Sequence, residues 1–287
     1  MQFLRNLLGR EKTAASASSP SSPITPSTLT RLKVGWATDV GKARRHNEDA
    51  AVVITAVHDG DEALPAFGLF ALADGMGGHQ AGEIASSLAA RTMAHHIMRQ
   101  LYLPTLVKQE YSTDQPTLDE VLVNAVQAAN TAVANQVPGG GTTLTCALLL
   151  GPRAYIAHVG DSRAYVVTGA NGLDQITHDH SLVDRLVELG QLTRDEAAAH
   201  PQKNVLYRAI GQRGVLEVET HVRTIPERER LLLCSDGLWG MVSDTEMNNI
   251  IATAPSLQVA CERLIDAANQ AGGHDNITAI LVEPPLG

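Results

Sequence analysis

The sequence has little that would place it in an oxidising compartment or a membrane. Among its 287 residues are only three cysteines, Cys146, Cys234 and Cys261, an odd number without the spacing of a disulfide framework or a zinc site. Free buried thiols in a cytoplasmic protein are therefore expected. No apolar run approaches the ~20 residues that cross a bilayer, and residues 1–10 lack the small-residue cleavage site of a secretory signal.

Basic residues are also scarce. Lys and Arg number 22 against 31 Asp and Glu, which gives a net charge of −9. Proteins that bind nucleic acid neutralise phosphates with cationic side chains, so this composition disfavours nucleic acid as a partner. The same charge opposes any phosphate-bearing substrate unless bound cations reverse the local field. If the protein handles phosphate, the composition points towards a metal.

The chain divides into a tail and one folded domain. Residues 12–30 consist almost entirely of Ser, Thr, Pro and Ala, which cannot bury enough apolar surface to offset the entropy of ordering them. We therefore expect residues 1–30 to form a disordered tail and residues 31–287 to form a single domain. A monomer is the simplest expectation.

Hydrophobic patterns predict strands and helices in blocks. The predicted strands are 33–38, 50–56, 66–73, 142–150, 154–159, 164–168, 230–235 and 277–282. The predicted helices are 81–101, 117–136, 181–190, 193–199, one capped by Ser243, and 257–270. Ile84, Leu88, Thr92 and Ile97 mark the expected buried stripe of the first helix. Tight turns join several strands, which favours an α+β layered domain with mainly antiparallel sheets.

Acidic residues stand where strands begin or end. Asp74-Gly75 and Asp236-Gly237 each follow an apolar strand, and Asp161 lies in a turn between two strands. Two further acidic positions, Glu48-Asp49 and Asp275, precede strands. Each aspartate alone is explained by turn chemistry. Together, four or five carboxylates without clustered Cys or His predict a site for Mg²⁺ or Mn²⁺, because these hard cations prefer oxygen ligands.

Seven motifs occur in the order of one known family. They are Gly41-x-x-Arg44-x-x-Asn47-Glu48-Asp49, Asp74-Gly75-Met76-Gly77-Gly78-His79 with Ala81-Gly82-Glu83, Gly141-Thr142-Thr143, Gly160-Asp161-Ser162-Arg163, Thr177-x-Asp179-His180-Ser181, Ser235-Asp236-Gly237-Leu238-Trp239 and Asp275-Asn276-Ile277-Thr278. The sequence resembles the PP2C-type (PPM) metal-dependent protein serine/threonine phosphatases, specifically their bacterial branch. The resemblance covers the chain from about residue 34 to its end.

The resemblance implies a four-layer α-β-β-α sandwich and a set of roles. Asp74 would bridge two cations, the second also taking the backbone carbonyl of Gly75, with Asp236 and Asp275 completing the first site. Glu48 and Asp49 would act through bound waters, and Asp161 with Asp236 would hold a weaker third cation. Arg44 would bind the substrate phosphate. Residues 181–204 would form a flap beside the active site, called the flap segment below.

The implied activity is hydrolysis of phosphoserine and phosphothreonine in proteins, the substrates of a Ser/Thr kinase. Two cations about 3.5–4 Å apart can share a water and lower its pKa towards neutrality. The resulting hydroxide would attack phosphorus in line, without a covalent phosphoenzyme. A histidine directly follows the Asp-Gly pair in eukaryotic relatives, but Met76 stands there in this chain. His79 is therefore one candidate general acid, and a metal-bound water is the other.

Two alternatives are open. A stress-response phosphatase acting on anti-sigma-factor antagonists would usually lack both the phosphate-binding arginine and the flap, whereas Arg44 and the flap segment are present. A catalytically silent module that recognises phosphoproteins should have lost metal ligands, and all the expected aspartates are present. A metal-dependent phosphatase assay discriminates between these readings.

Overall fold

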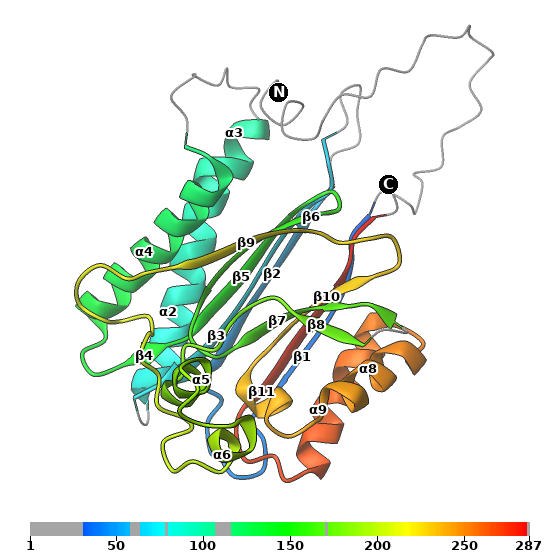
Figure 1. Cartoon of the computed structure of the whole chain (residues 1–287). Coiled ribbons are helices and arrows are strands. Elements are labelled where there is room, and N and C mark those ends of the chain that lie inside the picture. Colours follow the sequence, from blue (N-terminus) through cyan, green and yellow to red (C-terminus); the bar gives the residue numbers. More distant parts are fainter. Residues whose placement is uncertain (1–30, 58–63, 78–79, 107–115, 170–171, 286–287) are drawn as a thin grey trace, which may run out of the picture.

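The computed structural model describes residues 31–57, 64–77, 80–106, 116–169 and 172–285. Within them, two antiparallel sheets lie against each other (Figure 1). The five-stranded sheet has the order β1 (Lys33–Asp39), β11 (Ile277–Glu283), β10 (Arg230–Cys234), β7 (Arg163–Val167) and β8 (Leu173–Gln175). The six-stranded sheet has the order β2 (Asp49–Ala56), β3 (Phe67–Met76), β5 (Leu144–Leu150), β6 (Arg153–Val159) and β9 (Glu219–Thr224), with β4 (Gly141–Thr142) paired to β3.

Helices cover the outer face of each sheet (Figure 1). The six-stranded sheet is covered by α2 (Gln80–Ile97) and α4 (Leu118–Gln136). The five-stranded sheet is covered by α8 (Asp244–Thr253) and α9 (Leu257–Gln270). A short π-helix, η2 (Met98–Tyr102), and α3 (Leu103–Leu106) follow α2, while α5 (Leu182–Glu188), α6 (Arg194–Ala198) and α7 (Asp236–Trp239) lie in connections. These layers confirm the predicted α-β-β-α sandwich.

Alternating side chains along the strands build three apolar layers. On β3, Leu69 and Ala71 face the helices α2 and α4, whereas Phe70 and Leu72 face the other sheet. The third layer lies between the five-stranded sheet and α8 and α9. This alternation is the period-two pattern of a strand buried on both faces. The sandwich therefore holds the strand ends in fixed positions, which matters for the acidic residues there.

Local sequence signals explain where the helices begin. Thr117 and Glu120 form a capping box at α4, in which each side chain accepts a hydrogen bond from the other residue's backbone N–H. Thr193 and Glu196 form the same box at α6. The helices predicted over 117–136 and 193–199 therefore begin at these capping residues. No helix in the described part of the chain is both long and apolar enough to span a membrane.

The predicted buried stripe of α2 is partly wrong. Ile84 is 51 % exposed, and Leu88 is only partly buried. The buried face consists mainly of small side chains: Gly82, Ala85, Ser86, Ala89, Ala90, Met93, Ala94 and Ile97. Small residues allow α2 to approach both the sheet and α4 closely, so close packing overrides the position of the largest apolar side chain. The sequence also gives no prediction for β8 and β9, which are short or largely exposed.

Candidate metal centre

The acidic residues of the motifs meet at one end of the sandwich because the strands that carry them end there. Asp49 begins β2 and lies opposite Asp74, near the end of β3, in the antiparallel register. In the other sheet, Asp236 follows β10 and Asp275 precedes β11, and these two strands are paired. Asp161 lies in the turn between β6 and β7, which connects the two sheets. Four of these residues, Asp74, Asp161, Asp236 and Asp275, therefore line one cavity of about 310 Å³, together with Glu48 and Arg44.

Neighbouring polar side chains fix the backbone around the acids. Thr143 Oγ1 accepts a hydrogen bond from the Asp74 N–H at 2.9 Å, and Thr142 Oγ1 donates to the Asp74 carbonyl at 2.8 Å. Asn276 donates to the carbonyls of Val40 and His46, and its Oδ1 accepts from the Glu48 N–H at 2.8 Å. The loop that carries Arg44 and Glu48 is thereby fastened to β11. The sequence motifs contain these residues, but sequence reasoning assigned no anchoring role to Asn276.

Gly75 lies where the backbone is too crowded for a side chain. A Cβ at this position would lie 2.3 Å from the Gly82 carbonyl oxygen and 2.7 Å from that of Glu48. The Gly75 N–H donates to the Glu48 carbonyl at 3.1 Å, so β3, α2 and the loop before β2 meet at this point. The Gly75 carbonyl is therefore held rigidly beside the acids.

Burial and mutual repulsion make this end of the protein unfavourable for bare carboxylates. Burial raises the pKa of Asp49 to about 7, and the charges of Asp236 and Asp275 add to this effect. Hydrogen bonds from Thr278 and Ser235 oppose it only in part. Burial and the charge of Asp275 raise the pKa of Asp236 to about 6. Burial, and after it the charges of Asp49 and Asp236, raise the pKa of Asp74 well above its usual range. Burial and the charges of Asp236 and Asp179 do the same for the pKa of Asp161. Such shifts are typical of carboxylates gathered to hold a cation.

The donor set fits hard divalent cations. Asp49 Oδ1 and Asp236 Oδ1 are buried and have no hydrogen-bond partner, although buried polar atoms nearly always have one. The other oxygen of Asp49 accepts from Ser235 Oγ at 2.9 Å and Thr278 Oγ1 at 2.6 Å, which aligns the carboxylate. The acids that line the cavity offer oxygen ligands, as Mg²⁺ and Mn²⁺ require. The residues present therefore match the predicted type of metal.

Arg44 lies at the mouth of this cavity. Its Nη2 donates to Asp275 Oδ2 at 2.7 Å, and 49 % of its side chain is exposed. Arg44 also lines a second, larger cavity of about 700 Å³ that extends under the flap segment. Asp161, Asn204, Asp236 and Asp275 line both cavities, so the acidic end opens directly into the larger space.

An ion-paired arginine that sequence reasoning missed forms part of the larger cavity. Arg163 donates to both oxygens of Asp179, at 2.9 and 2.7 Å, and its guanidinium carbon lies 3.6 Å from the ring centroid of Trp239. All three residues lie in the family motifs, which was the available signal.

His79 lies outside the described residues, as does the tail 1–30, so those predictions stay untested.

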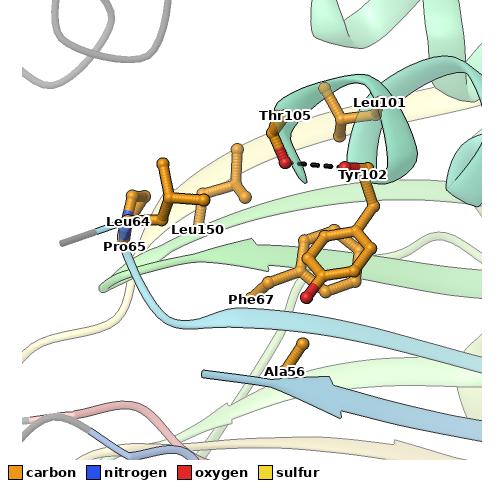
Figure 2. Close-up of a pocket in the computed structure, with 8 residues that line it drawn as sticks. All are labelled: Ala56, Leu64, Pro65, Phe67, Leu101, Tyr102, Thr105 and Leu150. Atoms are coloured by element: carbon orange, nitrogen blue, oxygen red, sulfur yellow. Dashed lines mark hydrogen bonds between the residues drawn. The ribbon is translucent and has the colours of Figure 1, made fainter. Parts of the chain in front are cut away.

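Another cavity lies at the opposite end of β3. Figure 2 shows it beside Phe67 and Tyr102, with apolar side chains around it. Its volume is about 20 Å³, and its lining contains no ionisable group except Tyr102. This space is only slightly larger than the roughly 10–15 Å³ that a single water needs, and no acidic residue lines it.

The sequence comparison agrees with this geometry. A profile of the family described as protein phosphatase 2C matches residues 42–281. The chain therefore belongs to the PP2C family of metal-dependent phosphatases, and it is a protein serine/threonine phosphatase of the bacterial type. It is 40% identical over 250 residues to the serine/threonine phosphatase stp of Listeria welshimeri serovar 6b, which covers 87% of this chain and 94% of that protein.

Solved structures support the same assignment. The Mycobacterium tuberculosis serine/threonine phosphatase PstP/Ppp matches with a TM-score of 0.71 and 36% identity, covering 88% of this chain and 98% of that one. A structure of the PstP catalytic domain in complex with two manganese ions matches with a TM-score of 0.68 and 36% identity, covering 88% of this chain and 97% of that one. The fold prediction and the enzyme class are therefore confirmed.

Proposed function

We propose that this phosphatase holds Mn²⁺ or Mg²⁺ with the acidic residues at the strand ends and hydrolyses phosphoserine and phosphothreonine in proteins. Asp74, Asp236, Asp275 and the backbone carbonyl of Gly75 would hold the two principal cations, with Asp74 contributing to both. Glu48 and Asp49 would act on the cations through waters, and Asp161 with Asp236 would hold a third, weaker cation. The observation that carries the proposal is a buried set of carboxylates, two with an unpartnered oxygen, beside an arginine in an open cavity.

When bound, the cations supply positive charge that lowers the pKa of a shared water and neutralises charge on the phosphoryl oxygens. The remaining groups favour direct in-line attack of water on phosphorus, without a covalent phosphoenzyme. Burial raises the pKa values of the Cys146 and Cys261 thiols to about 12. Burial also raises the pKa of the Cys234 thiol. These thiols are therefore poor nucleophiles.

Arg44 binds the substrate phosphate in this proposal. Its planar guanidinium matches two phosphoryl oxygens, which a lysine ammonium does not. The half-exposed side chain lies between the acids and the larger cavity, where a phosphorylated side chain would enter. Asp275 holds one terminal nitrogen of Arg44, which limits the orientations of the guanidinium.

The protein part of the substrate lies in the larger cavity. The flap segment contributes Arg194, Lys203 and Asn204 to its wall, and these side chains can contact the peptide that carries the phosphate. The leaving alkoxide requires a proton, for which His79 and a bound water remain the two candidates. The physiological substrates are phosphoproteins made by a Ser/Thr kinase in the cytoplasm.

The test is release of phosphate from a phosphothreonine peptide across a titration of Mn²⁺ and Mg²⁺. We expect turnover that requires the metal and is lost in Asp236→Asn. Tight binding of the peptide without turnover at any metal concentration would support a silent binding module instead. Full activity in Asp236→Asn would refute the assignment of the ligands while leaving the enzyme class intact.

A further inference from the structure

Four histidines surround one carboxylate at the seam between the two sheets. Glu219 and His221 lie on β9, the edge strand of the six-stranded sheet, and His158 lies opposite Glu219 on β6. His178 and His180 lie on the connection from β8, the edge strand of the other sheet, to α5. Residues from both sheets thus meet around Glu219. This set, called the histidine cluster below, contains none of the residues proposed to bind Mn²⁺ or Mg²⁺.

The two inner histidines fix the position of the carboxylate. His180 Nδ1 accepts a hydrogen bond from the Gly160 N–H at 3.1 Å, so its Nε2 carries the proton and donates to Glu219 Oε2 at 3.0 Å. His158 donates from Nε2 to the His178 carbonyl at 3.0 Å, and its Nδ1 lies 2.8 Å from Thr145 Oγ1. Both rings are buried and occupied by these bonds. They orient Glu219 and the backbone of His178 towards the surface.

The other carboxylate oxygen faces the two outer histidines. Glu219 Oε1 lies 3.0 Å from His178 Nδ1 and also contacts His221 Nε2. Glu219 and His221 are two residues apart on a strand, so their side chains leave the same face. The three potential ligand atoms all lie within 4.8 Å of one another. The His178 side chain is 67% exposed, so an ion from solvent has access.

We infer that His178, His221 and Glu219 form a second metal site, distinct from the aspartates, that takes a borderline transition ion such as Zn²⁺. Two histidines and one glutamate are a known zinc ligand set, which leaves a fourth position for water. Zinc–ligand bonds of about 2.0–2.1 Å place tetrahedral ligand atoms roughly 3.3 Å apart. The 3.0 Å between His178 Nδ1 and Glu219 Oε1 therefore requires only a small outward movement.

The ligands of the histidine cluster disfavour Mg²⁺ and Mn²⁺, the cations proposed for Asp49, Asp74, Asp161, Asp236 and Asp275. These five residues are called the aspartate centre below. Imidazole nitrogens suit Zn²⁺, Cu²⁺ and Ni²⁺, whereas Mg²⁺ and Mn²⁺ prefer carboxylates and water. Burial alone would raise the pKa of Glu219, but hydrogen bonds from His180, His221 and His178 outweigh it and hold that pKa well below its usual value. Glu219 is thus an anionic ligand. His180 donates a hydrogen bond to the other oxygen of Glu219, and carboxylates that bind metals are commonly oriented by such hydrogen bonds.

A bound ion would tie β9 to the connection that leads into the flap segment. His178 directly precedes Asp179, which holds Arg163 in the wall of the larger cavity. Two residues further on, Ser181 caps α5, the first helix of the flap segment. The site therefore fixes the base of the flap segment to the edge of the opposite sheet, and its occupancy does not depend on phosphatase turnover.

The test is a Zn²⁺ titration of the full chain by calorimetry, with excess Mg²⁺ to occupy oxygen ligands. Losing a group that only supports a metal ligand weakens binding about 10–100-fold, so we expect at least that loss when a ligand itself is removed in His178→Ala or His221→Ala. His95→Ala, which removes an exposed histidine of α2, is the matched control and should bind Zn²⁺ like the wild type.

Crystals soaked in Zn²⁺ give an independent measurement. Anomalous diffraction at the zinc edge should show a peak between His178, Glu219 and His221 that disappears in His178→Ala. Zn²⁺ affinity and stoichiometry unchanged in His178→Ala, or anomalous signal at the aspartates only, would overturn the proposal. Because the His178 side chain is 67% exposed, its replacement should leave the fold intact, so a loss of Zn²⁺ binding in this variant cannot be attributed to misfolding.

Discussion

The aspartate centre and the histidine cluster both gather ionisable side chains from the two sheets. They differ in whether those side chains find hydrogen-bond partners and opposite charges within the protein. In the aspartate centre, buried like charges repel each other and two carboxylate oxygens lack donors. In the histidine cluster, by contrast, no described side-chain nitrogen or oxygen is buried without a partner. The first arrangement lowers stability until a cation binds, whereas the second stabilises the fold by itself. The aspartates are therefore arranged to bind cations at a cost in folding stability, whereas the histidine cluster can stabilise the fold and bind a cation as well.

The largest expected effect is the loss of activity in Asp236→Asn. Asn keeps the shape of the side chain but removes a charge that the cations require, so metal-dependent stabilisation of the transition state is lost. We expect kcat/KM on a phosphothreonine peptide to fall by about 10³-fold, roughly 4 kcal/mol of transition-state free energy. Asp244→Asn, in the first turn of α8, is the matched control and should retain activity. A loss below tenfold in Asp236→Asn would contradict the proposed role of this residue.

Removing the charge at the centre of the histidine cluster should destabilise the metal-free protein. Glu219→Gln removes the charge that three histidines bind, and each hydrogen bond to a charged group is worth about 1.5–3 kcal/mol. We expect the metal-free protein to lose roughly 2–4 kcal/mol, measured by urea unfolding in a chelator.

Glu217→Gln provides the control for that change. Glu217 is two residues away and pairs with Arg208, but its side chain is 79% exposed. An exposed ion pair contributes about 0–1 kcal/mol, so this variant should differ little from the wild type. Equal effects of the two substitutions would mean that the histidine cluster has no special stabilising role.

Arg44 separates phosphate binding from metal binding. Its replacement by Ala removes a charge that is half exposed and lies outside the buried carboxylates. We expect kcat/KM to fall about 10–100-fold, or 1.4–2.7 kcal/mol, with the larger share in KM. Mn²⁺ affinity, measured by calorimetry, should change much less than in Asp236→Asn. A large loss of Mn²⁺ affinity would show that Arg44 acts on the metal centre through Asp275.

The sequence predicted that the aspartates come together at one end of the sheets, and it gave no indication of the histidine cluster. Asp74, Asp236 and Asp275 each abut a strong apolar strand, so their convergence follows from the predicted sheet. The histidines come from three segments that lie 20 to 63 residues apart, one of which is β9. The segment that forms β9 is polar and mostly exposed, and it is held as a strand by its hydrogen bonds to β6. Because this pairing depends on tertiary contacts, the sequence of β9 has no alternating hydrophobic pattern that would predict a strand.

The smallest expected effect tests the stability half of the comparison directly. In the absence of metal, the Asp236 carboxylate is buried beside Asp275 and Asp74, and one of its oxygens has no donor. Asn is neutral and can donate to a neighbouring carboxylate, so Asp236→Asn should be more stable than the wild type by about 1–2 kcal/mol in a chelator. Saturating Mn²⁺ should reverse the order, because the cation binds the folded wild type more tightly and raises its Tm. Thermal unfolding with and without Mn²⁺ measures both. A variant less stable than the wild type in the chelator would mean that the aspartate makes a stabilising hydrogen bond without metal, and the contrast between the two clusters would then disappear.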